Sequence, residues 1–106
     1  MPVTHIVAFN VPANTAGSLT SAFLDLKEGC KKDGQSYILS VKGGKQISPE
    51  PFHHDIKVVF IVEFATADDI AYYLDHDPVH DAFKQRVRAE WAIEGVVVLD
   101  FVDGDY

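Results

Sequence analysis

Residues 75–81 concentrate the side chains best able to do chemistry: two histidines and three aspartates surround Pro78. Histidine and carboxylate ligands suit zinc and other transition metals. His76 and His80 would share one helix face only if a helix ran through both, and a residue before proline avoids the helical region. We therefore expect no metal site here. Asp77 is better interpreted as the N-cap of a helix that begins at Pro78.

His80 lies on or beside an apolar stripe that includes Phe83 and Val87. One interpretation is a histidine whose polar atoms are satisfied at the core or at the rim of a pocket. The other is a general base with a pKa near neutrality. Such a base would take a phenolic proton, or an acidic C–H proton flanked by two carbonyls. Tyr73 or Tyr72 would then donate a hydrogen bond to the developing enolate oxygen.

His5 shares one face of a predicted strand with Val7 and Phe9, because side chains alternate along a strand. If that face lines a cavity, His5 would orient a substrate or bind a phenol there. Otherwise it is a first-strand polar residue bonded to a neighbouring chain. The candidate catalytic residues are His80 and Tyr73. The candidate ligand contacts are His5, Val7, Phe9, Tyr72 and Phe83.

Hydrophobic periodicity predicts the elements that must position these residues. We expect a ferredoxin-like βαββαβ order, an α+β fold whose four-stranded antiparallel sheet carries both helical segments on one face. The strands are predicted at 3–10, 36–47, 55–65 and 93–102, and the helices at 15–31, 66–74 and from 77 onward. The second strand should be weak or bulged at Gly43 and Gly44.

Helix boundaries carry their own signals. Asn14 or Thr15 is expected to cap the first helix, and Gly34 to close it. Thr66 resembles the start of a capping box, with Asp69 in place of the usual glutamate.

The chain is 47% hydrophobic, and its strands alternate poorly between apolar and polar residues. Helices on one side can cover only one face of the sheet, so we expect an apolar excess on the other, in Val7, Phe9 and the third and fourth strands. A second copy packed through this face would close an eight-stranded α+β barrel. Burying about 800 Å² of apolar surface per partner contributes about 20 kcal/mol before association entropy is counted. A monomer with that face exposed would aggregate.

Composition excludes several classes of function. The 106 residues predict one domain, and 16 acidic against 9 basic side chains give a charge of −7, which disfavours nucleic acid and anionic membranes as partners. We expect no membrane span and no secretory signal. The lone Cys30 fits a reducing, cytoplasmic location. No glycine-rich phosphate loop joins a strand to a helix, so no cofactor is expected.

Four short motifs, in order, resemble the stress-responsive A/B barrel domain family. They are Thr-His-Ile-Val-Ala-Phe at 4–9, Val-Glu-Phe-Ala-Thr-Ala-Asp-Asp at 62–69, the segment 72–83, and Val-Val-Leu-Asp-Phe at 97–101. In the third, the family typically carries Tyr-x-x-His-Pro-x-His-x-x-Phe. The resemblance covers essentially the whole chain and implies a dimeric α+β barrel.

The family also implies a site. One plant member, olivetolic acid cyclase, closes a linear poly-β-keto thioester by an aldol reaction, using a histidine of the His-Pro-x-His segment and a nearby tyrosine. The histidine matches His80, and a first-strand histidine matches His5. The tyrosine falls on Leu74 without a gap, and on Tyr73 if Asp77 is an insertion. A further family histidine falls on Val58 here.

We expect a homodimer with an apolar cavity in each subunit, between sheet and helices or within the barrel. Two functions therefore stand. In the first, the protein is a cofactor-free cyclase or lyase that acts on a polyketide-like or phenolic molecule with His80 as base. In the second, it is a stress-associated dimer that binds a small apolar or aromatic ligand, or stabilises other proteins, without turnover.

Overall fold

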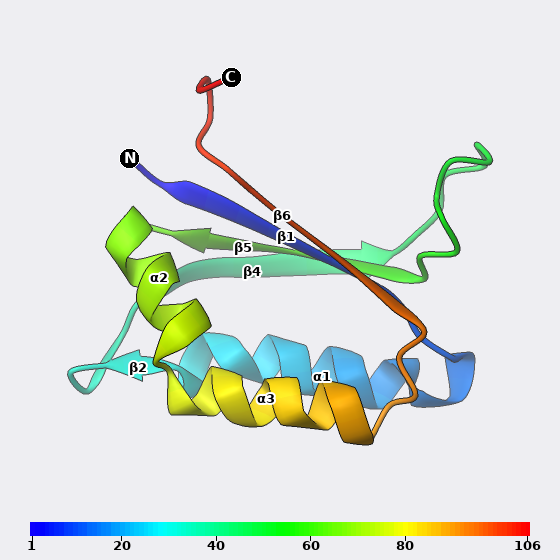
Figure 1. Ribbon diagram of the computed structural model, residues 1–106, viewed down its shortest axis with the longest axis horizontal. Coiled ribbons are helices and arrows are strands. Elements are labelled where there is room, and N and C mark those ends of the chain that lie inside the picture. The colour runs from blue at the N-terminus through cyan, green and yellow to red at the C-terminus, as the bar shows by residue number, and fades with distance from the viewer.

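Strand β1 lies at the centre of the sheet in the computed structural model, which describes residues 1–106 (Figure 1). It pairs with β5 on one side and β6 on the other, and the sheet order is β4-β5-β1-β6. All pairings are antiparallel. The elements are β1 (Val3–Asn10), α1 (Ala13–Gly29), β2 (Lys31–Lys32), β3 (Gln35–Ser36), β4 (Ile38–Lys45), β5 (Val58–Phe64), α2 (Ala67–Asp75), α3 (Pro78–Ala89) and β6 (Gly95–Phe101). The predicted ferredoxin-like order is confirmed.

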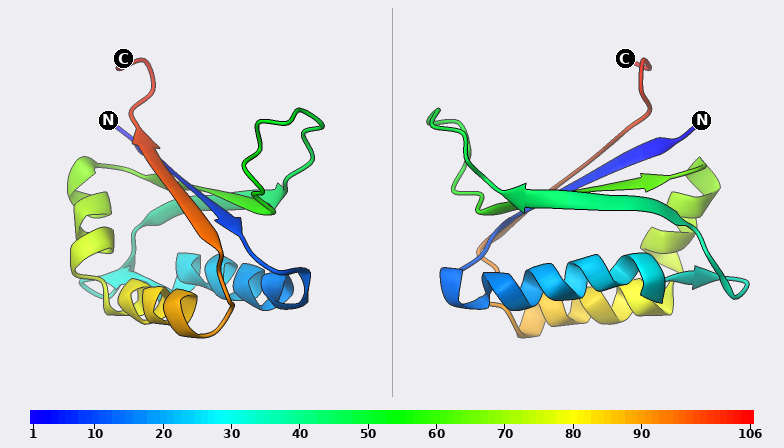
Figure 2. Two further views of the ribbon diagram at one scale, coloured as in Figure 1. Left: turned by 45° about the vertical axis from the view of Figure 1, so that its right-hand side comes forward. Right: turned by 180° about the vertical axis from the view of Figure 1, so that it is seen from behind.

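The helices all lie on one side of the sheet (Figure 2). Helices α1 and α3 run side by side beneath it, while α2 stands across one end and connects β5 to α3 (Figure 1). No helix is both long enough and apolar enough to cross a membrane.

The ends of α1 differ from the prediction. Its N-cap is Pro12, which offers no side-chain hydrogen bond, so neither Asn14 nor Thr15 caps it. Its C-cap is Cys30, whose N–H donates to the carbonyl oxygen of Leu26. Gly34 does not close the helix but lies, at φ 76°, in the turn of a short β2–β3 hairpin that the sequence did not predict.

The N-caps of α2 and α3 confirm the prediction. Thr66 Oγ1 accepts a hydrogen bond from the N–H of Asp69 at 3.1 Å. Asp77 Oδ1 accepts from the N–H of Val79 at 2.8 Å and from that of His80 at 3.2 Å. These bonds satisfy N–H groups that a helix start would otherwise leave unpaired.

Strand β4 is irregular, but not at the glycine pair where we expected it. Its pairing with β5 shifts register between Ile38 and Ser40. Gly43 has a different role, since a Cβ there would lie 2.3 Å from the carbonyl oxygen of Val59 and 2.9 Å from the Phe60 ring. A glycine is required at this position because the neighbouring backbone approaches so closely.

The core lies between the sheet and the helices. Every second residue of β1 and β5 faces inward and is buried. Phe9, Phe60 and Phe23 form its centre, with the rings of Phe23 and Phe60 stacked 4.0 Å apart. This corrects one expectation: Val7 and Phe9 belong to the helix-covered face, not to the uncovered one.

Trp91 closes the core beyond the end of α3. Its side chain is 1% exposed, and its indole N–H donates to Ser18 of α1 at 3.0 Å. The Arg86 guanidinium lies 4.6 Å from the ring. The Trp91 carbonyl accepts from the hydroxyl of Thr15 at 2.7 Å, so both helices are tied to one residue.

The opposite face of the sheet has no cover in this chain. In register across the sheet, it presents Ile6 and Ala8 of β1 beside Ile61 and Val59 of β5. The edge strand β6 is exposed on both sides: Leu99 on the uncovered face is 57% exposed, and Val96 and Val98 on the helix side are 45% and 49% exposed.

Candidate functional site

His5, Tyr73 and His80 meet at the end of the core where β1 begins. They come from β1, α2 and α3, and their exposed fractions are 2%, 1% and 7%. The rings of Tyr73 and His80 are stacked 3.7 Å apart, and the His5 ring lies edge-on to Tyr73 at 5.9 Å. Both candidate catalytic residues thus adjoin one candidate ligand contact in a single cluster.

The tautomer of His80 follows from its hydrogen bond. Its Nδ1 lies 2.8 Å from the carbonyl oxygen of Tyr73, and a carbonyl only accepts, so Nδ1 carries the hydrogen. In the neutral ring Nε2 is therefore a free base. Burial lowers the pKa of His80 to about 4, the Tyr73 carbonyl opposes this, and the charge of Lys84 adds to it. His80 is neutral at pH 7, with a pKa below the near-neutral value that we expected.

His5 is oriented by an acid. Its Nδ1 donates to the carboxylate of Asp100, its cross-strand partner on β6. The neutral ring then also exposes Nε2 as a base. The sequence allowed His5 to bond to a neighbouring chain. In the structure its partner, Asp100, belongs to the same chain. The side chain of Asp100 is 39% exposed, so the pair lies at the edge of the core.

Three polar atoms of the cluster have no partner within the chain: Nε2 of each histidine and the hydroxyl of Tyr73. No fully buried side-chain nitrogen or oxygen is unpaired, so each of these atoms keeps some solvent-accessible surface. Burial also raises the pKa of Tyr73, which keeps the phenol protonated and able to donate. The cluster thus offers a neutral base at His80, a second imidazole at His5 and a donor at Tyr73 in apolar surroundings, a set suited to proton transfer.

A buried network holds the start of the helix that carries His80. The hydroxyl of Tyr37 donates to Asp77 Oδ2 at 2.6 Å, while Oδ1 caps α3. Asp77 is 1% exposed. Burial, and then the charge of Asp77, raise the pKa of the Cys30 thiol to about 12, so little of the nucleophilic thiolate forms near pH 7. Sequence reasoning missed Tyr37, because nothing local connects it to a residue forty positions away.

Residues 3–103 match the family model described as "Stress responsive A/B Barrel Domain". The chain belongs to this family. No curated protein matches it. No group of three or more histidine, cysteine, aspartate or glutamate side chains in this family member is arranged to hold a metal ion.

Solved structures with a similar fold cover nearly the whole chain. An Arabidopsis thaliana protein is 19% identical with a TM-score of 0.79, over 98% of this chain and 97% of that one. A hydroxynitrile lyase from Passiflora edulis is 16% identical with a TM-score of 0.80, over 99% and 96%. A protein from Jannaschia sp. CCS1, described as dimeric and ferredoxin-like, is 16% identical with a TM-score of 0.71, over 96% and 99%. At these identities the likeness shows the fold.

The family's tyrosine aligns with either Tyr73 or Leu74, and these two side chains have different surroundings. Tyr73 stacks on His80, whereas Leu74 offers only its carbonyl, which accepts from Lys84 at 3.0 Å. Tyr72 points elsewhere, since its ring packs on Tyr37 at 5.5 Å. Of the three, only the Tyr73 side chain adjoins both histidines.

The remaining candidate contacts are core residues. Phe83 is 7% exposed and its ring lies parallel to that of His80 at 6.4 Å. Val7 and Phe9 continue the inward face of β1 away from His5, and Phe9 meets the stacked phenylalanines at the centre.

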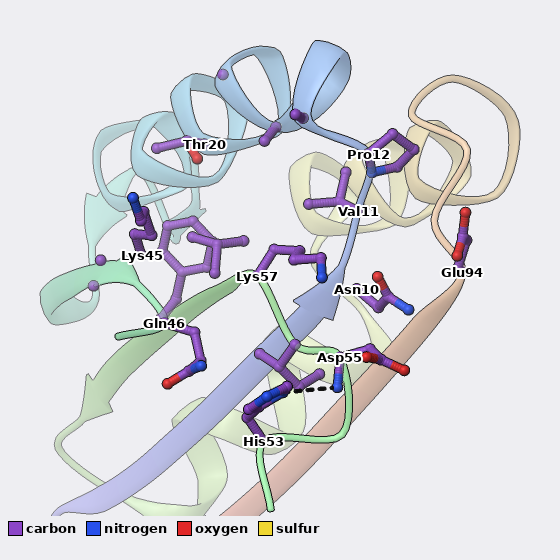
Figure 3. A pocket seen from close by; sticks show the side chains of 18 of the residues that line it. Asn10, Val11, Pro12, Thr20, Lys45, Gln46, His53, Asp55, Lys57 and Glu94 are labelled. Carbon is purple, nitrogen blue, oxygen red and sulfur yellow. Dashed lines mark hydrogen bonds between the residues drawn. The ribbon is translucent and has the colours of Figure 1, made fainter. Parts of the chain in front are cut away.

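A cavity of about 920 Å³ lies at the other end of the core, between the start of α1 and the β4–β5 connection (Figure 3). The strand register separates this cavity from the histidine cluster. Phe9 pairs with the cavity residue Val58, whereas His5 pairs with Val62, four residues further along β5. A smaller cavity of about 380 Å³ lies on the uncovered face, beside Ala8 and Val59. Neither is lined by the histidine cluster, around which the sequence predicts the ligand contacts.

Proposed function

We propose that this protein is a homodimeric, cofactor-free lyase with His80 as general base and Tyr73 as hydrogen-bond donor. Its substrate would be a small aromatic or polyketide-like molecule with an acidic hydroxyl or C–H group beside a carbonyl or nascent carbonyl carbon. The stress role and the cytoplasmic location expected from the sequence belong to the same proposal.

One observation carries the catalytic part. His80 is held through Nδ1 by a carbonyl, which turns its free Nε2 lone pair into a base of fixed tautomer. The stacked Tyr73 adds an unpaired phenol, and His5 adds a second fixed imidazole. Such preorganised groups in a low-dielectric site stabilise developing charge far better than water does.

The proton balance is simple. His80 Nε2 takes the acidic proton, a carbon–carbon bond breaks or forms as the electron pair moves, and Tyr73 donates to the oxygen that carries developing charge. His80 then returns the proton to the product or leaving group. A pKa of about 4 keeps Nε2 unprotonated throughout the neutral range and makes the return easy. The hydroxynitrile lyase from Passiflora edulis supports the reaction class, since a similar fold carries a lyase.

The dimer part rests on the uncovered sheet face. Its apolar residues include Ile6, Ile61 and Leu99 from three neighbouring strands. A second copy packed on this face would bury them, and a structural neighbour is described as dimeric. Exposed apolar patches of this kind mark association surfaces.

The test uses mandelonitrile, an aromatic hydroxynitrile, beside an aromatic β-diketone. With mandelonitrile, His80 would remove the hydroxyl proton, the carbon–cyanide bond would break to give benzaldehyde, and cyanide would receive the proton. His80→Gln removes the general base and should lower kcat/KM by at least about a hundredfold. Tyr73→Phe removes the hydrogen-bond donor and should lower kcat/KM by about tenfold or more. His54→Gln, in the exposed loop, is the matched control. Full activity in His80→Gln would contradict the proposal.

A second candidate function is a ligand-binding dimer without turnover. It is favoured by one observation, the position of the larger cavity away from the histidines. In that case the wild-type protein turns over neither probe, and His80→Gln leaves ligand affinity nearly intact.

A further inference from the structure

The 920 Å³ cavity is within the size range of small-molecule sites. Its inner wall is apolar, formed by Phe60 and Val58 of β5, Val11, and Leu24 of α1. Three further α1 residues, Ala13, Ala16 and Gly17, line it with small side chains or none, which is why the space between helix and sheet is open here.

Charged side chains surround this apolar wall, and none of them is paired. Lys45, Lys57, Asp55 and Glu94 all line the cavity, and none forms an ion pair within the chain. Lys45 lies on the β4 side and Lys57 near the middle, while Glu94 lies on the far side beyond Asn10 (Figure 3). Asp55 lies on the same side as Asn10, so Lys45 is the cation furthest from the two acids in this view (Figure 3).

The apolar wall adjoins both lysines, since Lys57 precedes Val58 in the chain and Lys45 lies across the ladder from it. Lys45 pairs with Val58 across the β4–β5 ladder, and Gly43 pairs with Phe60 two residues along. A ligand whose apolar body covers Phe60 and Val58 would place its polar end at Lys45 and Lys57. His53 adds a donor at the loop, because its Nδ1 accepts from the Asp55 N–H at 3.2 Å and its Nε2 therefore carries hydrogen in the neutral ring.

We propose that this cavity binds a monocarboxylic acid with an apolar body, its carboxylate on Lys45 and Lys57. Charge-assisted hydrogen bonds to two ammonium groups fit one carboxylate. Asp55 and Glu94 repel a second negative charge, which disfavours a phosphate dianion. The site lies at the opposite end of the core from the histidine cluster, so the inference does not depend on the lyase proposal.

Decanoate is the probe, measured by calorimetry and by amide chemical shifts, beside decanol and decylamine. We expect one decanoate per chain, bound at least about tenfold more tightly than either analogue, which corresponds to about 1.4 kcal/mol. The double variant Lys45→Gln/Lys57→Gln should lose about tenfold in decanoate affinity. Lys42→Gln, on the uncovered face beside Ile61, is the matched control and should bind as wild type.

A variant that fills the cavity without harming the fold makes the test decisive. A Cβ at Gly17 meets no atom within 4 Å, and leucine favours a helix more than glycine does. Gly17→Leu should therefore fold and lose at least about tenfold in affinity, whereas Ser21→Leu, on α1 outside the cavity, should not. His80→Gln should bind decanoate normally, which separates this site from the proposed lyase.

Three results would overturn the proposal: no decanoate binding, undiminished binding in Gly17→Leu, or decylamine binding as tightly as decanoate. Shift changes confined to the uncovered face, at Ile6 and Leu99, would also overturn it, because they would place decanoate on the sheet surface instead.

Discussion

Acidification should unfold this protein partly through one side chain, His80. The folded chain holds this imidazole neutral, because burial lowers its pKa from the usual 6.5 to about 4. The unfolded chain has no such burial, so its histidine takes up a proton as the pH falls through 6.5. Between these two values the unfolded state binds more protons, and stability therefore falls as the pH falls.

The magnitude follows from the interval between the two pKa values. Each pH unit is worth about 1.36 kcal/mol, so an interval from 6.5 to about 4 amounts to about 3 kcal/mol of stability, present above pH 6.5 and lost progressively towards pH 4. His80 is 7% exposed, so solvent screening takes little from this figure. The loss would be a large part of the stability of an ordinary small domain.

Urea unfolding followed by far-ultraviolet circular dichroism, at pH 7 and pH 4 and one protein concentration, measures the effect. We compare the wild type with His80→Gln, whose side chain takes up no proton in this range. The wild type should lose about 3 kcal/mol more than the variant over this range. His76→Gln, at the exposed C-cap of α2, should behave as wild type. Equal losses in wild type and His80→Gln would refute the reasoning.

Three further changes test the fold and the assembly. Tyr37→Phe leaves the buried Asp77 carboxylate without its phenol donor and should cost about 2 kcal/mol by chemical denaturation; a negligible cost would show that the bond is dispensable. Gly43→Ala should cost at least about 2 kcal/mol, because its Cβ meets a backbone oxygen at 2.3 Å, whereas Gly44→Ala, which meets nothing, should fold normally in the same assay. Leu99→Glu should convert a dimer into a monomer of about 11.7 kDa by light scattering; an unchanged dimer would exclude association through the uncovered face.

Much of the fold can be predicted from the sequence, because the strands and the helix N-termini have distinctive residue patterns. The alternating run of β5 and the caps at Thr66 and Asp77 are examples. The β2–β3 hairpin carried no such signal, since its two-residue strands are polar. Val7 and Phe9 were assigned to the wrong face because β1 is apolar on both sides, so alternation could not identify the covered one.

The candidate site was only partly predictable, for a different reason. His80 and His5 carry distinctive chemistry wherever they stand, but their partners depend on register and on the angle between α2 and α3. Asp100 is 95 positions from His5, and only the β1–β6 register brings the two together. The choice of Tyr73 over Tyr72 likewise depends on how the short α2 is oriented, which no periodic pattern specifies.

Trp91 gives this molecule an internal fluorophore. It is the sole tryptophan; Thr15 and Ser18 of α1 hydrogen-bond to it, and its ring packs on Phe83 of α3. Its emission should therefore be blue in the folded chain and shift to the red when the two helices part. Because the sheet holds no tryptophan, a red shift that precedes the loss of strand signal would reveal α1 and α3 separating while the sheet is still assembled.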